Sequence, residues 1–246
     1  RDEDLRADRQ PEFTQIDLEM SFVEEEQVLA ATEGMVRAAF AEGCGIELAA
    51  PFPRLTWQEA MDRYGSDKPD TRFGLELQDI STLAGRSSFR VFASVVEEGG
   101  AVKGIRLPGG AGQFSRKGIE ALEGVAREAG AKGLAWIKLE EGKGSGPLAR
   151  FFQGDLLAEL TAAMAAAPGD LLLFAAAPPR EAARIMGQVR LAAGRALDLL
   201  DPTDFRFLWV TRFPLFAPEE DGRRRPPPPP LTPPPPRELA GLDEEP

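Results

Sequence analysis

The first 22 residues constrain the fold most, because a dense run of charge leads directly into an alternating pattern. Seven of the first ten residues are charged. From Phe13 to Phe22 apolar residues alternate with polar ones, which is the period of a strand with one buried and one open face. The apolar side carries Ile16, Leu18, Met20 and Phe22, and the other side carries Phe13, Gln15, Asp17 and Glu19. We therefore predict a strand over Phe13–Phe22 whose open face offers an aromatic ring, an amide and two carboxylates to a ligand.

Three arginines stand just upstream of this predicted strand. Arg1, Arg6 and Arg9 carry planar, forked donors that suit phosphate groups. The alternative interpretation is a charged surface hairpin, which composition alone favours because runs of charge are usually solvated.

Composition limits both the architecture and the partners. The 246 residues, 43% of them hydrophobic and 28% charged, are enough for one large core or two smaller ones, and we predict two domains. The net charge of -11 disfavours nonspecific adhesion to nucleic acid or to an anionic membrane. Contact with RNA therefore requires a local basic cluster.

The residue types that are rare or missing restrict the chemistry. The chain has no histidine and one cysteine, Cys44, which excludes an internal disulfide and a cysteine zinc cluster. Chemistry must then rest on carboxylates, arginines and a hard cation. The lone cysteine suits a reducing compartment, and no apolar run or signal pattern indicates a membrane or export, so we expect a cytoplasmic protein. Because the chain opens on Arg1 rather than methionine, we expect a fragment or a trimmed product.

Two helices are predicted in the first third. Helical spacing of apolar residues predicts one over residues 24–43, with Glu24 to Glu26 in the first turn, where the dipole favours negative charge. The segment Thr56–Glu59 is a capping box that opens a short helix closed by Gly65. The apolar face of the first helix consists of Val28, Ala31, Met35, Val36, Ala39 and Phe40.

From about Leu77 the pattern changes to shorter, alternating elements. Ser115 and Asp155 are predicted to cap two helices, the second ending at Met164, and a third is predicted over residues 180–200. The run Gly142–Gly146 lacks the spacing of a phosphate loop and is interpreted as a flexible turn. Strands are predicted over residues 89–96, 102–107, 134–139, 171–176 and 205–211.

The C-terminal segment is dominated by proline. Nine of the eleven residues over Pro226–Pro236 are proline, preceded by Arg223 to Arg225. Such a run can neither continue a helix nor pair as a central strand, so we expect it to be extended or disordered. Proline-rich stretches can also be ligands for aromatic-lined grooves.

The string Arg1–Asp17 resembles motif 2 of the bacterial-type aspartyl-tRNA synthetases. The resemblance continues in that family's order through four further segments, Tyr64–Asp70, Val102–Gly110, Gly130–Lys138 and Leu208–Phe216. Two positions depart from the family pattern. Arg212 stands where the family usually has aspartate, and Pro228–Thr232 stands where it has His-His-Pro-Phe-Thr.

The resemblance implies an α+β fold, with part of the antiparallel-sheet catalytic core of a class II aminoacyl-tRNA synthetase and an inserted α/β domain. The insertion is similar to the GAD domain that these enzymes share with a transamidase subunit. The implied domains are residues 1–74 for the partial core, 75–203 for the insertion, 204–216 for a strand returning to the core, and 217–246 for a proline-rich tail.

The resemblance also implies an activity, aspartate–tRNA ligation, with ATP and Mg²⁺ as cofactors. Arg1 would be the catalytic residue, bridging the α-phosphate and the aspartate carboxylate, and Asp17 would hold the aspartate α-ammonium group. The ATP-binding residues would be Arg1, Asp2, Glu3, Gln10 and Phe13, with Phe13 stacked on adenine. Arg6 and Arg9 would contact the tRNA acceptor end, and no metal ligand is assigned in this chain.

The implied partners are tRNA(Asp), L-aspartate and ATP, with no membrane, and the intact family member is expected to be a homodimer. Several family segments are missing here, among them motif 3 and the anticodon-binding barrel, so we expect the chain alone not to charge tRNA. The alternative is a noncatalytic module that binds tRNA or a protein. Its basic patch would consist of Lys103, Arg106, Arg116, Lys117, Lys132 and Lys138.

Overall fold

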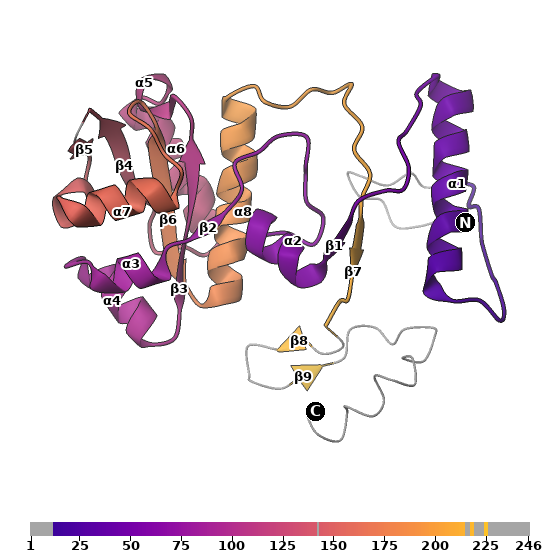
Figure 1. The fold of residues 1–246 in the computed structure, drawn as a ribbon, viewed down its shortest axis with the longest axis horizontal. Helices are drawn as coiled ribbons and strands as arrows, with labels where there is room; N and C mark the ends of the chain where they lie inside the picture. The colour runs from indigo at the N-terminus through magenta and orange to yellow at the C-terminus, as the bar shows by residue number, and fades with distance from the viewer. Residues whose placement is uncertain (1–11, 142, 215–216, 219–223, 226–246) are drawn as a thin grey trace. The chain divides into compact units, whose positions relative to one another are not determined.

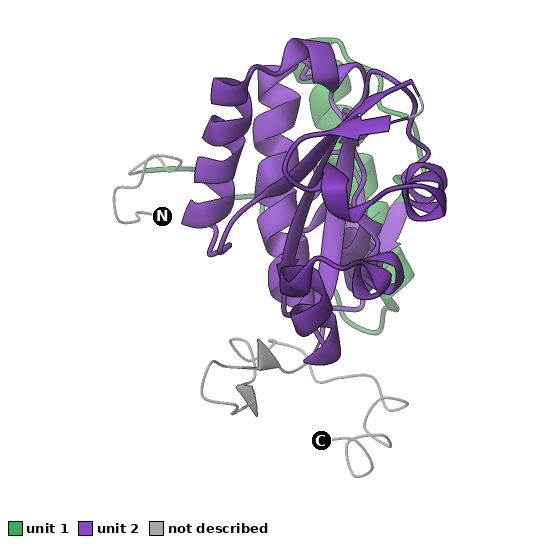
Figure 2. Ribbon diagram, turned by 90° about the vertical axis from the view of Figure 1, so that its left-hand side faces the viewer, with its two compact units in different colours: residues 1–53 green, residues 54–246 purple. Residues whose placement is uncertain are grey.

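The computed structural model describes residues 12–141, 143–214, 217–218 and 224–225 (Figure 1). The chain divides into two compact units, residues 1–53 and residues 54–246, coloured separately in Figure 2. The prolines from Pro226 onward lie outside the described residues.

The described part of the first unit contains one helix, α1, over Glu25–Cys44, which confirms the helix predicted for this region. It begins with a capping box in which the Glu24 backbone N–H donates to Gln27 Oε1 at 2.8 Å. It ends at Gly45, whose φ of 68° is the left-handed conformation that glycine adopts most easily. The predicted apolar face is only partly covered, since Val28 and Met35 are each 37% exposed.

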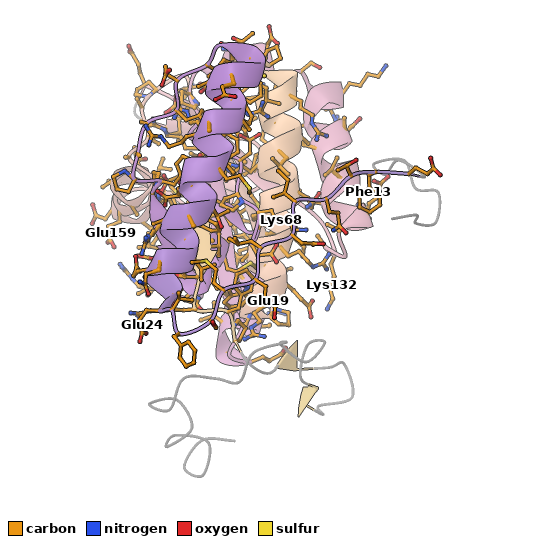
Figure 3. The ribbon with its side chains drawn as sticks, turned by 90° about the vertical axis from the view of Figure 1, so that its right-hand side faces the viewer. Phe13, Glu19, Glu24, Lys68, Lys132 and Glu159 are labelled. Atoms are coloured by element: carbon orange, nitrogen blue, oxygen red, sulfur yellow. The ribbon has the colours of Figure 1, made fainter. Side chains whose placement is uncertain are left out.

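The predicted strand over Phe13–Phe22 is wrong. This run contains neither helix nor strand and leads into α1 (Figure 3), and a single bridge residue, Glu12, precedes it. A strand requires hydrogen bonds to a neighbouring strand, and the described part of this unit provides none. The apolar side chains that were predicted to be buried are therefore exposed, with Ile16 75% exposed and Phe22 fully exposed.

The second unit is built on a five-stranded sheet in the order β2-β3-β6-β4-β5, in which all neighbours are antiparallel. The predicted strands over residues 102–107, 134–139 and 171–176 are confirmed as β3, β4 and β6. The strand bounds are β2 Gln78–Asp79, β3 Ala101–Leu107, β4 Ala135–Glu140, β5 Lys143–Ser145 and β6 Leu171–Ala177.

Helices cover both faces of this sheet, so the unit has three layers (Figure 1). The alternation along β6 shows the division: Leu171 and Leu173 face a cluster with α6 and α8, whereas Leu172 and Phe174 face one with α3, α4 and α7. The fold is α+β, as predicted. The helix bounds are α3 Ser81–Arg86, α4 Arg90–Glu97, α5 Gly110–Gln113, α6 Arg116–Glu128, η1 Ala149–Phe151, α7 Asp155–Ala163 and α8 Pro179–Ala196.

The strand predicted over residues 89–96 is wrong, because this segment is the helix α4. Its β-branched and aromatic content favours a strand, but Phe89, Phe92 and Val96 recur at helical spacing. Phe92 is 2% exposed and packs edge-on against Phe89 and Phe174, with ring centroids 4.8 and 6.5 Å apart. Burial of one helical face therefore overrides the local strand propensity.

Other boundaries differ by a few residues. Ser115 caps α6 as predicted, but the N-cap of α7 is Gly154 rather than Asp155. The third helix ends at Ala196, four residues early, and the strand predicted over residues 205–211 is reduced to Trp209–Thr211, labelled β7. The segment after Gly142 is not a free turn, because Lys143–Ser145 pairs with β4 as an edge strand.

The first strand of the second unit pairs with a strand that lies more than 150 residues later in the chain. β1, over Arg54–Thr56, runs parallel to β7, and the short helix α2, over Trp57–Tyr64, follows β1 directly. The predicted capping box is confirmed: Thr56 Oγ1 accepts from the Glu59 N–H at 3.1 Å, and the Thr56 N–H donates to Glu59 Oε2 at 2.7 Å. Ala217–Pro218 and Arg224–Arg225 form the small antiparallel pair β8–β9.

Candidate functional site

Most of the predicted ligand-binding residues fall on the first segment of the chain. Arg1, Asp2, Glu3, Arg6, Arg9 and Gln10 lie outside the described residues. Phe13 and Asp17 are described, and both belong to the irregular run before α1 (Figure 3). Phe13 is half-buried and Asp17 is exposed, so a planar ring and a carboxylate are accessible four residues apart. Their roles in binding stay predictions.

The best organised polar cluster of the second unit surrounds Arg190 on α8, where the loop Gly65–Gly74 passes. The guanidinium is 1% exposed, and its Nη2 donates to the backbone carbonyls of Asp70 at 2.8 Å and of Phe73 and Gly74 at 2.7 Å each. Its Nε also donates to the Gly74 carbonyl at 3.1 Å. The same group lies over the Phe73 ring at 4.1 Å and the Tyr64 ring at 4.9 Å from the centroids.

Charged neighbours complete this cluster. Burial lowers the pKa of the Arg190 guanidinium, while Asp70, Glu76 and Tyr64 nearby act in the opposite direction. An arginine remains cationic even so, because the guanidinium is the most strongly basic side chain in proteins. Arg63 forms a two-bond pair with Glu76 at 2.8 and 2.9 Å, and this hydrogen bonding lowers the pKa of the Glu76 carboxyl.

The loop carries its own internal bonds. The side chain of Arg72 donates to Asp70 Oδ1 at 3.0 Å and Oδ2 at 2.7 Å, and this hydrogen bonding lowers the pKa of the Asp70 carboxyl. The Lys68 N–H donates to Ser66 Oγ at 3.0 Å. At the tip, the side chains of Asp67 and Lys68 are exposed. Hydrogen bonds thus hold the backbone of this loop, and its tip exposes one acidic side chain, Asp67, and one basic side chain, Lys68.

Sequence reasoning found this loop by resemblance but missed Arg190. The available signal was a charged residue placed among the apolar positions of a helix. Arginine on a buried face needs several acceptors, because its charge and its five donors cannot be left unpaired. The surrounding buried residues of α8 are Ile185, Met186, Gly187, Val189, Ala193 and Gly194.

The six basic residues of the alternative RNA-binding patch do not form one open surface. Lys103 is buried and lies 3.3 Å from both Asp62 and Asp79, and Lys138 donates to two backbone carbonyls at 2.7 Å each. The others are distributed as follows: Arg106 bonds the Ala165 carbonyl and pairs with Asp170, Arg116 pairs with Glu120, and Lys117 and Lys132 are exposed. Lys103 and Lys138 are therefore bonded within the fold, while Arg116, Lys117 and Lys132 stay exposed.

The described residues contain no group of three or more acidic or cysteine side chains that could hold a metal ion. No helix among them has both the length and the apolar character needed to cross a bilayer.

Comparison with known proteins gives a consistent family. The family described as tRNA synthetases class II (D, K and N) matches residues 1–239. The chain is 51% identical over 223 residues to an Aspartate–tRNA ligase of Halalkalibacterium halodurans, covering 91% of this chain and 38% of that protein. It is 48% identical over 247 residues to an Aspartate–tRNA(Asp/Asn) ligase of a Geobacillus species, and this match covers 100% of this chain and 42% of that protein. The chain therefore spans about two fifths of the length of these relatives.

Proposed function

Because the chain belongs to the class II tRNA synthetases of the D, K and N type, we propose that it is a segment of an aspartate–tRNA ligase. The observation that carries the proposal is the 51% identity over 223 residues to a protein named Aspartate–tRNA ligase. A second relative at similar identity is named for both tRNA(Asp) and tRNA(Asn). Both names contain aspartate and tRNA, and the second specifies tRNA(Asp) and tRNA(Asn), so the proposal commits to tRNA(Asp), L-aspartate and ATP.

The reaction has two steps. A carboxylate oxygen of aspartate attacks the α-phosphorus of ATP, which forms aspartyl-adenylate and releases pyrophosphate. A hydroxyl at the 3' end of the tRNA then attacks the activated carbonyl, which forms aspartyl-tRNA and releases AMP. Both steps depend mainly on positioning the reactants and on stabilising charge as it develops.

The residue roles are part of the same proposal. Arg1 bridges the α-phosphate and the substrate carboxylate, because its forked donors can neutralise two adjacent anions. Phe13 stacks on adenine and Asp17 holds the α-ammonium group, and their accessibility in the described run is consistent with these roles. Asp2, Glu3 and Gln10 contact ATP, while Arg6 and Arg9 contact the tRNA acceptor end.

Mg²⁺ would supply charge neutralisation between ATP phosphate oxygens, as a hard cation with oxygen ligands does. The described residues contain no group of three or more acidic or cysteine side chains that could hold a metal ion, and no step is assigned to a metal. We place the intact protein in the cytoplasm, as a homodimer. The inserted domain over residues 75–203 belongs to the proposal as a structural part of that enzyme, because its basic side chains Lys103 and Lys138 bond within the fold.

A chimera tests the function directly. The segment of the Halalkalibacterium halodurans ligase that aligns with residues 12–211 is replaced by this chain's own residues, and ATP–pyrophosphate exchange is measured with aspartate, asparagine or lysine. We expect exchange that depends on aspartate alone. Asp17→Asn should raise the KM for aspartate roughly a hundredfold or more, since it removes the charged partner of an ammonium group, about 3 kcal/mol.

Two controls make the result decisive. Phe13→Ala should raise the KM for ATP more than the KM for aspartate, because it removes a stacking surface and no charge. Gly124→Ala, at a helical position with open space around it, should change neither constant. A folded chimera with no exchange, or one that prefers asparagine or lysine, contradicts the proposal.

A further inference from the structure

Two connectors join the strand pair β1–β7 and helix α2 to the five-stranded sheet of the second unit. The outgoing connector, residues 65–77, leaves α2, and the return connector, residues 197–208, leads back to β7. They are bonded to each other: Arg72 Nη1 donates to the Asp201 carbonyl at 3.4 Å, and Arg206 Nη1 donates to the Thr71 carbonyl at 3.2 Å. Both bonds are exposed, so water competes with them and they hold the connectors only weakly.

Arg190 is the buried anchor of the outgoing connector. Its four bonds reach the carbonyls of Asp70, Phe73 and Gly74, three successive points where the connector turns across α8. Carbonyls buried without a partner are costly, so these bonds specify one path for the connector. The guanidinium holds five donors in a rigid, planar arrangement, whereas the lysine ammonium is a single point on a flexible stem, so a lysine at this position would not reproduce the same set of bonds.

The packing beside Arg190 allows this approach. A Cβ at Gly187 would come within 2.7 Å of the Gly65 carbonyl oxygen, and a Cβ at Gly194 would come within 2.7 Å of the Phe73 ring. Gly187, Arg190 and Gly194 are spaced by three and four residues, so they lie on one face of α8. The two glycines on this face therefore allow the outgoing connector to pack closely against α8, and Arg190 provides the cation that bonds it.

We propose that Arg190 is a positioning residue that fixes the outgoing connector on α8. As a result the strand pair β1–β7 and the five-stranded sheet move as one rigid body, and the exposed tip Asp67–Lys68 is held in one place. The proposal goes beyond the proposed function and does not depend on it, because it concerns only contacts within this chain.

Hydrogen–deuterium exchange on the full chain tests it, with peptides covering residues 65–77 compared with peptides covering β3 and β6. Arg190→Lys keeps the charge and removes the fork, while Arg190→Met keeps much of the volume and removes every donor. We expect the connector peptides to exchange at least about tenfold faster in both variants, because the bonds that fix them are lost. The β3 and β6 peptides should exchange at the wild-type rate.

The matched control is Arg184→Lys. Arg184 lies on the same helix but is exposed and donates to a single carbonyl, that of Ala129, at 2.8 Å. The Arg184→Lys variant should leave hydrogen–deuterium exchange in the connector unchanged. A second measurement is limited trypsinolysis at Arg72, whose cleavage should accelerate in the Arg190 variants, whereas Lys68 is protected by the following proline.

Three outcomes overturn the proposal. Connector exchange in Arg190→Lys could equal that of the wild type, which would mean that other contacts fix the loop. Exchange could accelerate equally in the connector and in β3 and β6, which would make Arg190 a general stability residue. Loss of the whole fold in Arg190→Lys would have the same meaning as uniform acceleration.

Discussion

The buried Lys103 forms two ion pairs, but we expect these pairs to contribute little to the free energy of unfolding. Its side chain is 9% exposed, whereas those of Asp62 and Asp79 are 49% and 47% exposed. Lys103→Met removes a buried charge and leaves two carboxylates that water can solvate, so we expect the free energy of unfolding to change by less than about 1 kcal/mol. The double variant Asp62→Asn with Asp79→Asn strands the buried ammonium and should cost about 2–4 kcal/mol.

Urea unfolding followed by tryptophan fluorescence measures both variants. Asp79→Asn keeps the oxygen that accepts from the Ser81 N–H at 2.9 Å, so this bond at the start of α3 is preserved. A larger loss from Lys103→Met than from the double variant would show that the ion pair itself, and not relief of a buried charge, governs stability here.

The carboxylates around Arg190 predict a dependence of stability on acid. Hydrogen bonds from Arg72 and Arg63 lower the pKa of Asp70 and of Glu76 below their ordinary values of 3.8 and 4.5. Such a group binds fewer protons folded than unfolded, so its contribution is complete above its unfolded pKa and is lost as pH falls through the lower folded one. We expect the urea midpoint to be flat from pH 7 to about 5 and to decline below about 4.5.

Glu76→Gln tests the assignment, because it removes one of the two titrating groups. Its urea midpoint should fall less steeply between pH 4.5 and 3 than that of the wild type. Equal slopes in the two proteins would show that other carboxylates produce the acid dependence.

At the scale of elements, two helical glycines have opposite roles. A Cβ at Gly187 on α8 would come within 2.8 Å of the Tyr64 carbonyl oxygen, whereas a Cβ at Gly124 on α6 would meet nothing within 4 Å. Gly187→Ala should destabilise the second unit by about 1–3 kcal/mol, because backbone must move to admit the methyl group. Gly124→Ala should stabilise it by about 0.5–1 kcal/mol through helix propensity. Thermal unfolding of the two variants would contradict this account if both shifted in the same direction.

The elements that sequence predicts well are those whose signal is local. Thr56 and Glu59 form a capping box that needs no other part of the chain, and Ser115 caps α6 in the same way. The segments predicted wrongly depend on a distant partner. Residues 89–96 become a helix because Phe92 finds Phe174 in β6, and the alternating run of residues 13–22 has no adjacent strand among the described residues.

The residues of the candidate site also differ in whether the sequence alone could identify them. Phe13 and Asp17 were identified from residue type and from resemblance to a family motif, which a sequence carries without a structure. Arg190 donates to carbonyls 116 to 120 residues earlier in the chain, so its place among the apolar positions of a helix signals a buried cation but does not reveal which carbonyls it bonds. Sequence therefore supplies the residues predicted to bind ligands, and structure supplies the residue proposed to hold a loop in place.

At the scale of the whole molecule, burial is distributed very unevenly. Of the 20 residues of α1, only Glu33 is buried, whereas the second unit carries two apolar clusters on the two faces of its sheet. Helices with little tertiary packing are marginal in water, because propensity alone rarely offsets the cost of ordering the chain. The first unit should thus unfold more easily than the second.

Two probes separate the units in one experiment. All three tryptophans, Trp57, Trp136 and Trp209, belong to the second unit, whereas circular dichroism at 222 nm also reports α1. We expect the circular dichroism signal to begin falling at lower urea than the fluorescence, a non-coincidence that excludes a single two-state transition. Ile137→Val, in the sheet core, should lower the fluorescence midpoint by the equivalent of about 0.5–1.5 kcal/mol and leave the early circular dichroism phase unmoved. Superimposable curves, or an early phase that shifts with Ile137→Val, would show that the two units share one cooperative core.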